Sequence, residues 1–121
     1  MQGVHDMNKN NREYIDYIED IFDSILKIEK FISKQSYEDF TRDEKSQYAV
    51  IRAFEIIGEA SKKVPKSIKK DHPEIPWRLM AGMRDKLIHD YFGVDIDVIW
   101  ETIKTDIKEI KPKIRAIIQN K

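Results

Sequence analysis

The fold is decided by the stretch from Asn11 to Lys34, NREYIDYIEDIFDSILKIEKFISK. Its apolar residues recur at spacings that alternate between four and three: Tyr14, Ile18, Ile21, Ile25, Ile28 and Ile32. This period places the apolar side chains on one face of an α-helix and the charged ones on the other. We therefore predict a long amphipathic helix that packs as one member of a helical bundle, although the same alternation also suits coiled-coil packing against a partner.

A second helix is predicted after a short turn. Thr41 is followed three residues later by Glu44, a capping box whose two side chains satisfy backbone N–H groups at a helix start. The helix should run to about Val64, with a buried face made of Val50, Ala53, Phe54, Ile57, Ala60 and Val64. Glu55 and Glu59 lie four apart, a pattern that can hold a metal ion, but no histidine or third carboxylate stands at ligand spacing. We therefore predict no metal site.

Two more helices should follow a break that contains two prolines. Pro76 suits the first turn of the third helix, which should end between residues 90 and 92, with Gly93 supplying the turn. The buried face of this helix should carry Trp77, Met80, Met83 and Leu87. Asp95 can cap the fourth helix, which Pro112 should kink or restart. No segment shows the strict alternation of a strand, so we predict an all-α antiparallel bundle of four main helices plus short turns.

Length and composition bound the class of protein. A chain of 121 residues can bury an ordinary core, and we expect residues 11 to 121 to form a single domain behind a loose tail over residues 1 to 10. With no cysteine, disulfides and thiolate-metal sites are excluded, and no apolar run approaches the ~18 residues of a membrane span. No signal peptide is visible, so we expect a cytoplasmic protein.

The zero net charge conceals a difference between the two halves of the chain. Residues 61 to 121 hold 14 basic and 9 acidic side chains, a formal charge of +5. The densest basic cluster in this half consists of Lys62, Lys63, Lys66, Lys69 and Lys70. Such a cluster could attract a polyanion, or it could be the solvated end of a lysine-rich helix. A pI near 6.8 argues against a general nucleic-acid-binding protein, so any binding of a polyanion should be local.

The most reactive group of side chains lies in residues 82 to 93, GMRDKLIHDYFG. Histidine exchanges protons near neutrality and arginine matches phosphate oxygens with a planar fork, so Arg84 and His89 suggest a phosphodiester site. If the segment is helical, Asp85 shares a face with His89 and could orient the imidazole and favour its protonated form. Arg84 and Tyr91 would share another stripe. Arg84 and His89 would diverge by about 140°, so a loosened helix end or a second copy of the chain must bring them together.

A second copy is the explanation that we favour. One motif histidine per chain cannot act as general base and general acid at once, whereas a symmetric dimer would place two histidines and two arginines around one scissile bond. We therefore predict a homodimer with Arg84 and His89 at or beside its two-fold axis.

This motif resembles that of a known family. The R-x4-H-x-Y spacing of Arg84, His89 and Tyr91 is that of the HepT-like proteins, the HEPN-domain toxins of HEPN/MNT toxin-antitoxin pairs. The resemblance covers roughly residues 12 to 115 through Ile56-Ile57-Gly58-Glu59-Ala60, Ile75-Pro76-Trp77, Gly82-Met83-Arg84 and Tyr91-Phe92-Gly93-Val94-Asp95. Many relatives carry a polar amide after the motif arginine, where this chain has Asp85, and a carboxylate would raise the pKa of the histidine more than an amide would.

The resemblance implies an all-helical, HEPN-like homodimer with a metal-independent endoribonuclease site at its interface, the toxin of a type VII pair that cleaves RNA. Arg84 and His89 would be catalytic, Asp85 would support them, and no cofactor would be needed. Tyr91 would be the residue to which a cognate MNT nucleotidyltransferase, the antitoxin, transfers AMP to block the site.

Two functions from different classes remain open on the sequence. An R-x4-H spacing alone is common in helices, and Tyr91 could be a half-buried tyrosine whose ring packs in the core. The alternative to an endoribonuclease is a non-catalytic helical module that binds a nucleotidyltransferase through Arg84, His89 and Tyr91. Cleavage of RNA by the purified protein in the presence of a chelator would discriminate between them.

Overall fold

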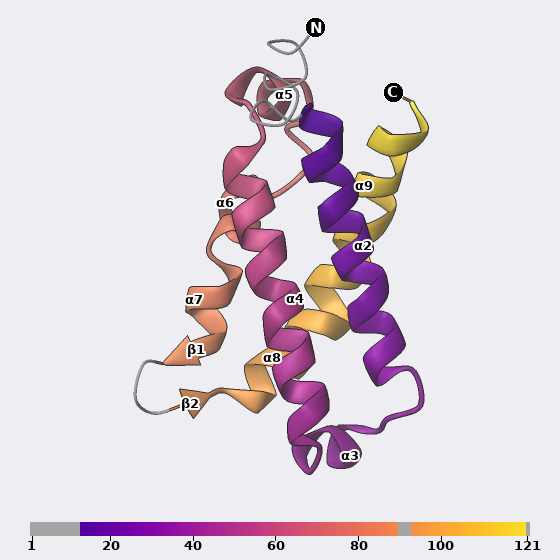
Figure 1. Ribbon diagram of the computed structural model, residues 1–121, viewed down its shortest axis with the longest axis vertical. Coiled ribbons are helices and arrows are strands. Elements are labelled where there is room, and N and C mark those ends of the chain that lie inside the picture. The colour runs from indigo at the N-terminus through magenta and orange to yellow at the C-terminus, as the bar shows by residue number, and fades with distance from the viewer. Residues whose placement is uncertain (1–12, 90–92, 121) are drawn as a thin grey trace, which may run out of the picture.

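A computed structural model describes residues 13–89 and 93–120, which form a bundle of four helical rods (Figure 1). The rods are α2 (Tyr14–Ile32), α4 (Glu44–Lys63), the pair α6 (Trp77–Ala81) and α7 (Met83–Leu87), and the run α8 (Ile96–Thr102), η2 (Ile103–Ile107) and α9 (Lys108–Gln119). Short helices α3 (Tyr37–Thr41) and α5 (Lys66–Asp71) join them. The all-α class with four main helices is confirmed, while the predicted tail over residues 1 to 10 lies outside the described residues.

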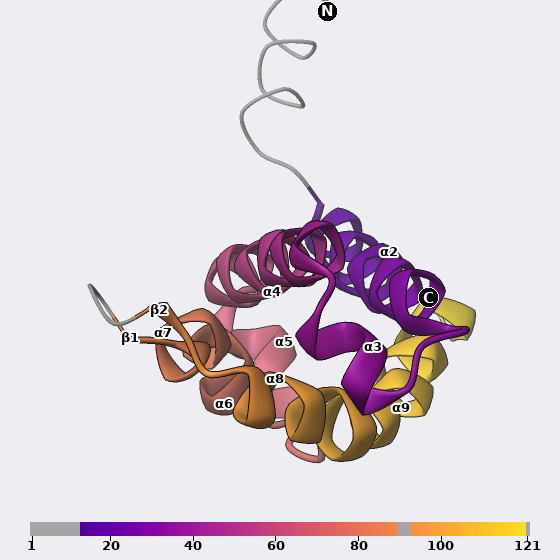
Figure 2. The same ribbon diagram turned by 90° about the horizontal axis from the view of Figure 1, so that it is seen from below.

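The rods enclose one core in a ring, seen end-on in Figure 2. α2 packs between α4 and α9, and α4 packs in turn against α6 and α7. α8 lies against α7 and continues through η2 into α9, which returns to α2. The Nζ atom of Lys111 lies 2.8 Å from Oε1 of Glu29 across this last contact. The ring is therefore closed by two helices from opposite ends of the described chain.

The predicted apolar stripe of α2 lies in the centre of the core. Its members Ile18, Ile21, Ile25 and Ile28 have no exposed surface. The faces predicted for α4 and for the third rod are buried as well. Each such side chain contributes roughly 1.5–3 kcal/mol on leaving water, so these stripes hold the bundle together. Within the two described ranges, no helix is both long and apolar enough to cross a membrane.

The N-terminal cap of α4 differs from the prediction. Asp43 caps the helix, since its Oδ1 accepts a hydrogen bond from the backbone N–H of Ser46 at 3.1 Å. A true capping box lies one helix earlier, where the Ser36 hydroxyl accepts from the Asp39 N–H and the Asp39 carboxylate accepts from the Ser36 N–H, both at 3.1 Å. Thr41 is instead the last residue of α3, so the predicted box between Thr41 and Glu44 is wrong.

The third rod is shorter and more broken than predicted. Gly82 separates α6 from α7, and α7 ends at Leu87. The chain then extends into β1 (Ile88–His89), which pairs antiparallel with β2 (Gly93–Val94). The Leu87 carbonyl accepts a hydrogen bond from the Asp95 N–H at 3.1 Å, which replaces a further helical turn. The predicted helix end at residues 90 to 92 and the predicted lack of any strand are therefore wrong.

The fourth rod begins at its predicted cap, and two later features depart from a regular α-helix: a π-helical turn and an internal proline. The Asp95 carboxylate caps α8 by accepting from the Val98 N–H at 3.1 Å. Pro112 lies inside α9, which passes through it without restarting. The wider π-turn of η2 has a sequence cause: Ile99, Ile103 and Ile107 are two successive steps of four, which would rotate the stripe by about 80° on a regular α-helix. With η2 in place, all three are buried.

Candidate active-site cleft between α4 and α7

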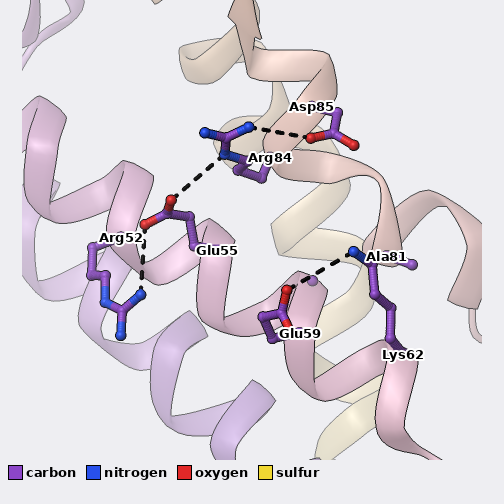
Figure 3. A pocket seen from close by; sticks show the side chains of 8 residues that line it. Arg52, Glu55, Glu59, Lys62, Ala81, Arg84 and Asp85 are labelled. Carbon is purple, nitrogen blue, oxygen red and sulfur yellow. Dashed lines mark hydrogen bonds and ion pairs between the residues drawn. The ribbon is translucent and has the colours of Figure 1, made fainter.

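A polar cleft of about 320 Å³ opens between α4 and the broken rod of α6 and α7. Its lining is charged apart from two small residues, and consists of Arg52, Glu55, Gly58, Glu59, Lys62, Ala81, Arg84 and Asp85. Figure 3 shows the α4 side chains facing those of α7 across the cleft. Arg84, the arginine of the motif, therefore lies in a hollow that only the folded chain creates.

Gly58 sets the separation of the two walls. A Cβ atom at this position would lie 3.2 Å from the carbonyl oxygen of Ala81, closer than an ordinary van der Waals contact. The missing side chain lets the end of α6 approach the backbone of α4, as expected for small residues on this helix. This close approach brings α7, which begins two residues after Ala81, beside the middle of α4.

Arg84 is held loosely between two carboxylates. Its Nε lies 3.6 Å from Oε2 of Glu55 on α4, and its Nη1 lies 3.4 Å from Oδ1 of Asp85, the next residue in the chain. Both contacts are longer than the 2.7–2.9 Å typical of charge-assisted hydrogen bonds. The side chain is 49% exposed, so the guanidinium is accessible to an anion that enters the cleft.

The remaining charges of the cleft are also paired. Nη1 of Arg52 lies 3.6 Å from the second oxygen of Glu55, and Nζ of Lys62 lies 3.9 Å from Oε1 of Glu59. These are exposed contacts, and such pairs contribute at most about 1 kcal/mol each to stability. The three cations of the cleft are therefore balanced by three carboxylates, through contacts that are long and partly exposed to solvent.

The structure places Arg84 and His89, which the sequence prediction considered on one helix, in two different elements, α7 and β1. Because α7 ends at Leu87 and His89 lies in β1, Asp85 and His89 do not share a helical face. The contact described for Asp85 is the one with Arg84, whose Nη1 lies 3.4 Å from its Oδ1. The expected 140° divergence between Arg84 and His89 does not apply either. His89 is described through its backbone pairing with Gly93, and its side chain lies outside the description. Tyr91, and with it the helical stripe predicted to join it to Arg84, lies outside the described residues.

Of the five lysines in the basic cluster, only Lys62 lines the cleft. Lys63 follows it at the end of α4. Lys66, Lys69 and Lys70 belong to α5, which lies at the far end of the bundle from the strand pair (Figure 1). Attraction of RNA by all five lysines stays a prediction, and only Lys62 is in direct reach of the cleft.

Of the α4 residues in this site, Lys62 is predicted as part of the basic cluster, whereas the prediction does not link Arg52, Glu55 or Glu59 to the motif arginine. Arg52, Glu55, Glu59 and Lys62 recur at spacings of three, four and three around Gly58, which places one charged stripe beside a point of close helix approach. This charged stripe beside a glycine is the sequence pattern that could have predicted the α4 wall of the cleft. The spacing of Glu55 and Glu59 by itself suggests only metal ligands, because the arginine that Glu55 contacts lies on another helix. In the described part of the chain, no three histidine, aspartate or glutamate side chains gather as a metal site would require.

The part of the sequence that forms the charged cleft, with its motif arginine, matches the profile of a known family. The sequence profile of the Ribonuclease HepT-like family matches residues 21–117, which include both walls of the cleft. The chain belongs to the HepT-like ribonuclease family. The resemblance drawn from the motif and its flanking runs is thereby confirmed.

Members of the HepT-like family with similar sequences come from several organisms. The chain is 57% identical over 106 residues to "Probable ribonuclease HepT" of Thermococcus cleftensis, covering 88% of this chain and 96% of the relative. It is 46% identical over 104 residues to a "Putative RNase" of Methanocaldococcus jannaschii, covering 86% of each. A "Putative RNase" of Caldanaerobacter subterraneus subsp. tengcongensis is 42% identical over 111 residues, 92% of this chain and 96% of the relative. No solved structure matches the chain significantly.

Proposed function

We propose that this HepT-like chain is a metal-independent endoribonuclease that acts in the cytoplasm as the toxin of a toxin-antitoxin pair. The observation that carries the proposal is the placement of Arg84 in a polar cleft of a chain whose relatives bear ribonuclease names. The half-exposed guanidinium can accept a phosphate without rearrangement of the core.

The proposed chemistry uses a nucleophile that RNA carries itself. The 2′-hydroxyl attacks the adjacent phosphorus, the bond from phosphorus to the 5′-oxygen breaks, and a 2′,3′-cyclic phosphate remains. A base removes the proton of the 2′-hydroxyl, and an acid protonates the leaving 5′-oxygen. His89 is the residue proposed to transfer protons, and Arg84 stabilises the negative charge that builds on the phosphoryl oxygens. DNA lacks the nucleophile and would not be cut.

The same chemistry leads us to propose a homodimer. Two proton transfers are needed and each chain brings one motif histidine, so two copies of His89 around one phosphodiester bond would supply base and acid. Sedimentation velocity at micromolar concentration should give a dimer. A species that remains monomeric up to the concentrations used for cleavage would contradict the composite site.

Tyr91 is the proposed point of control. It occupies the last position of the motif, and a transferred AMP would bring a negative charge that competes with RNA phosphate for Arg84. Co-expression with a nucleotidyltransferase of the antitoxin class should add the mass of AMP, and Tyr91→Phe should abolish the addition. An unmodified protein, or a modification that persists in Tyr91→Phe, would refute this assignment.

The decisive experiment is RNA cleavage by the purified protein in excess chelator. The wild type should cleave, and Arg84→Ala should lose roughly 10²- to 10³-fold in rate, as expected on removal of one group that stabilises transition-state charge. Arg78→Ala is the matched control, because Arg78 is an exposed arginine of α6 outside the cleft. Equal rates in Arg84→Ala and wild type would remove Arg84 from catalysis. A wild type that leaves RNA intact but binds the nucleotidyltransferase would favour the non-catalytic module.

A further inference from the structure

The two carboxylates that contact Arg84 differ in how they are anchored. Glu55 lies in the middle of α4, a helix of 20 residues that is buried along its other face. Asp85 lies on α7, a helix of five residues, directly after Arg84. A contact with Asp85 therefore moves with Arg84, whereas a contact with Glu55 ties the guanidinium to the rest of the bundle.

The two contacts also use different edges of the guanidinium. Glu55 approaches Nε at 3.6 Å and Asp85 approaches the terminal Nη1 at 3.4 Å. Among the residues drawn in Figure 3, the second terminal nitrogen has no ion-pair partner. A phosphate prefers two parallel N–H donors of the fork. It could take the terminal edge by displacing Asp85 while Glu55 keeps its place at Nε.

The two carboxylates also differ in solvent exposure, and Glu55 is again the more firmly held of the two. The side chain of Asp85 is 77% exposed, and that of Glu55 is 34% exposed. The second oxygen of Glu55 is also engaged, since Nη1 of Arg52 lies 3.6 Å from it. Glu55 is thus held from both sides, whereas Asp85 lies at the rim, where water can replace its contact at little cost.

We propose that Glu55 is a positioning residue for Arg84, which it holds with the terminal guanidinium edge turned toward the RNA phosphate, and that Asp85 occupies that edge until RNA displaces it. The inference rests on the proposed ribonuclease function. It adds Glu55 to the site and gives Asp85, which the family resemblance implied to be a supporting residue, the opposite effect. Glu55 supports the transition state through Arg84, and Asp85 competes with the substrate for the same nitrogen atoms.

The test exploits the fact that both residues carry the same charge in the same cleft. Glu55→Gln and Asp85→Asn each remove one negative charge within reach of Arg84. If net charge alone mattered, both variants would bind RNA more tightly and cleave it at least as well.

The proposal instead expects kcat to fall about 10- to 100-fold in Glu55→Gln, the range associated with small misplacement of a reacting group. Asp85→Asn should lower KM severalfold. Glu109→Gln is the control, because Glu109 forms a similar exposed pair with Lys113 outside the cleft.

A double variant separates positioning from a general structural effect. Adding Glu55→Gln to Arg84→Ala should cause no further loss of rate, because Glu55 acts through Arg84. Additive losses would overturn the proposal, as would an unchanged kcat in Glu55→Gln. Circular dichroism and thermal unfolding should show Glu55→Gln folded like the wild type.

A second measurement reads the position of Arg84 without any activity. In ¹⁵N-labelled protein, the Nε–H signal of Arg84 can be assigned by its loss in Arg84→Lys. Glu55→Gln should make this group more mobile on the picosecond to nanosecond timescale, whereas Asp85→Asn should not. If the wild type cleaves no RNA, the proposed function fails, and this measurement still decides whether Glu55 holds Arg84. An Nε–H signal with equal order in wild type and Glu55→Gln would overturn the positioning role.

Discussion

The rods on opposite sides of the bundle are built in contrasting ways. α2 is an unbroken helix of 19 residues whose isoleucine stripe fills the core, and it contributes no residue to the cleft between α4 and α7. α6 and α7 have five residues each, and α7 carries Arg84 and Asp85 on its exposed side. Segments this short do not form stable helices alone. Stability is therefore concentrated in the long regular helices, and the candidate chemistry lies on a segment that those helices hold in place.

The largest effect on RNA cleavage should come from His89, which lies in β1 directly after the short helix α7. His89→Ala should reduce RNA cleavage by roughly 10²- to 10⁴-fold, the usual contribution of a positioned proton-transfer group. Its free energy of unfolding should change by no more than about 0.5 kcal/mol. Single-turnover cleavage and urea unfolding measure the two quantities. His72→Ala, which truncates a histidine in the loop before α6, serves as control, and equal cleavage rates in the two variants would exclude His89 from catalysis.

The converse effect should come from α2. Ile25→Ala should lower the free energy of unfolding by roughly 2–5 kcal/mol, because it leaves a cavity at a position with no exposed surface. Cleavage per folded molecule should persist. The neighbouring Leu26 is 41% exposed on the other face, so Leu26→Ala should change stability by no more than about 0.5 kcal/mol. Similar midpoints in denaturant for the two variants would contradict the burial of the stripe.

A smaller effect on cleavage should come from Gly58, where the long helix α4 meets the end of the short helix α6. Gly58→Ala places a methyl group 3.2 Å from the Ala81 carbonyl and should push α6 and α7 away from α4 by a few tenths of an ångström. We expect a severalfold loss of cleavage, since small misplacement of reacting groups is costly. In Gly82→Ala the nearest contact is 3.6 Å from the Arg78 carbonyl, an ordinary distance, so its loss should be smaller. The reverse order would contradict Gly58 as the spacer.

The smallest effect concerns the cap of α4 and depends on pH. Hydrogen bonds from the Ser46 hydroxyl and backbone N–H, and from Gln35, lower the pKa of Asp43 below its ordinary 3.8. A carboxyl whose pKa is lower in the folded state stabilises the fold above its unfolded pKa, and this contribution is lost as the pH falls through the folded value. Asp43→Asn should therefore slightly lower the Tm at pH 7 and match the wild type in strong acid. Asp23→Asn, on exposed α2 surface, is the control; a Tm difference that is constant with pH would contradict the linkage.

The long rods could be predicted almost residue by residue from the sequence. In α2 and α4 a period of about 3.6 extends over five turns, so local errors average out and one face must be buried. Phe31 shows the limit of this pattern: it lies three residues after Ile28, a spacing that suits the buried stripe, and yet its side chain is 37% exposed. The cap of α4 shows another: Thr41 and Asp43 are both good capping residues, and the choice between them depends on where α3 ends.

The cleft could be predicted only in part. Arg84 was found from its motif, but the end of α7 depends on a hydrogen bond between Leu87 and Asp95, and no helical period reveals that contact. The pairing of Arg84 with Glu55 joins two helices whose relative register is set by Gly58. Local patterns identify residue types and faces, whereas the partner of a charged side chain on another helix is decided by packing.

The closure of the ring between α2 and α9 has a kinetic consequence. The contact between Glu29 and Lys111 joins positions 82 residues apart, whereas α2 and α4 are neighbours in the chain. The entropic cost of closing a loop rises with its length, so the pairing of α2 with α4 can form early and the docking of α9 follows. Until α9 docks, one flank of the α2 isoleucine stripe stays in water. Aggregation during refolding should therefore begin along this seam, on the side of the molecule away from the cleft.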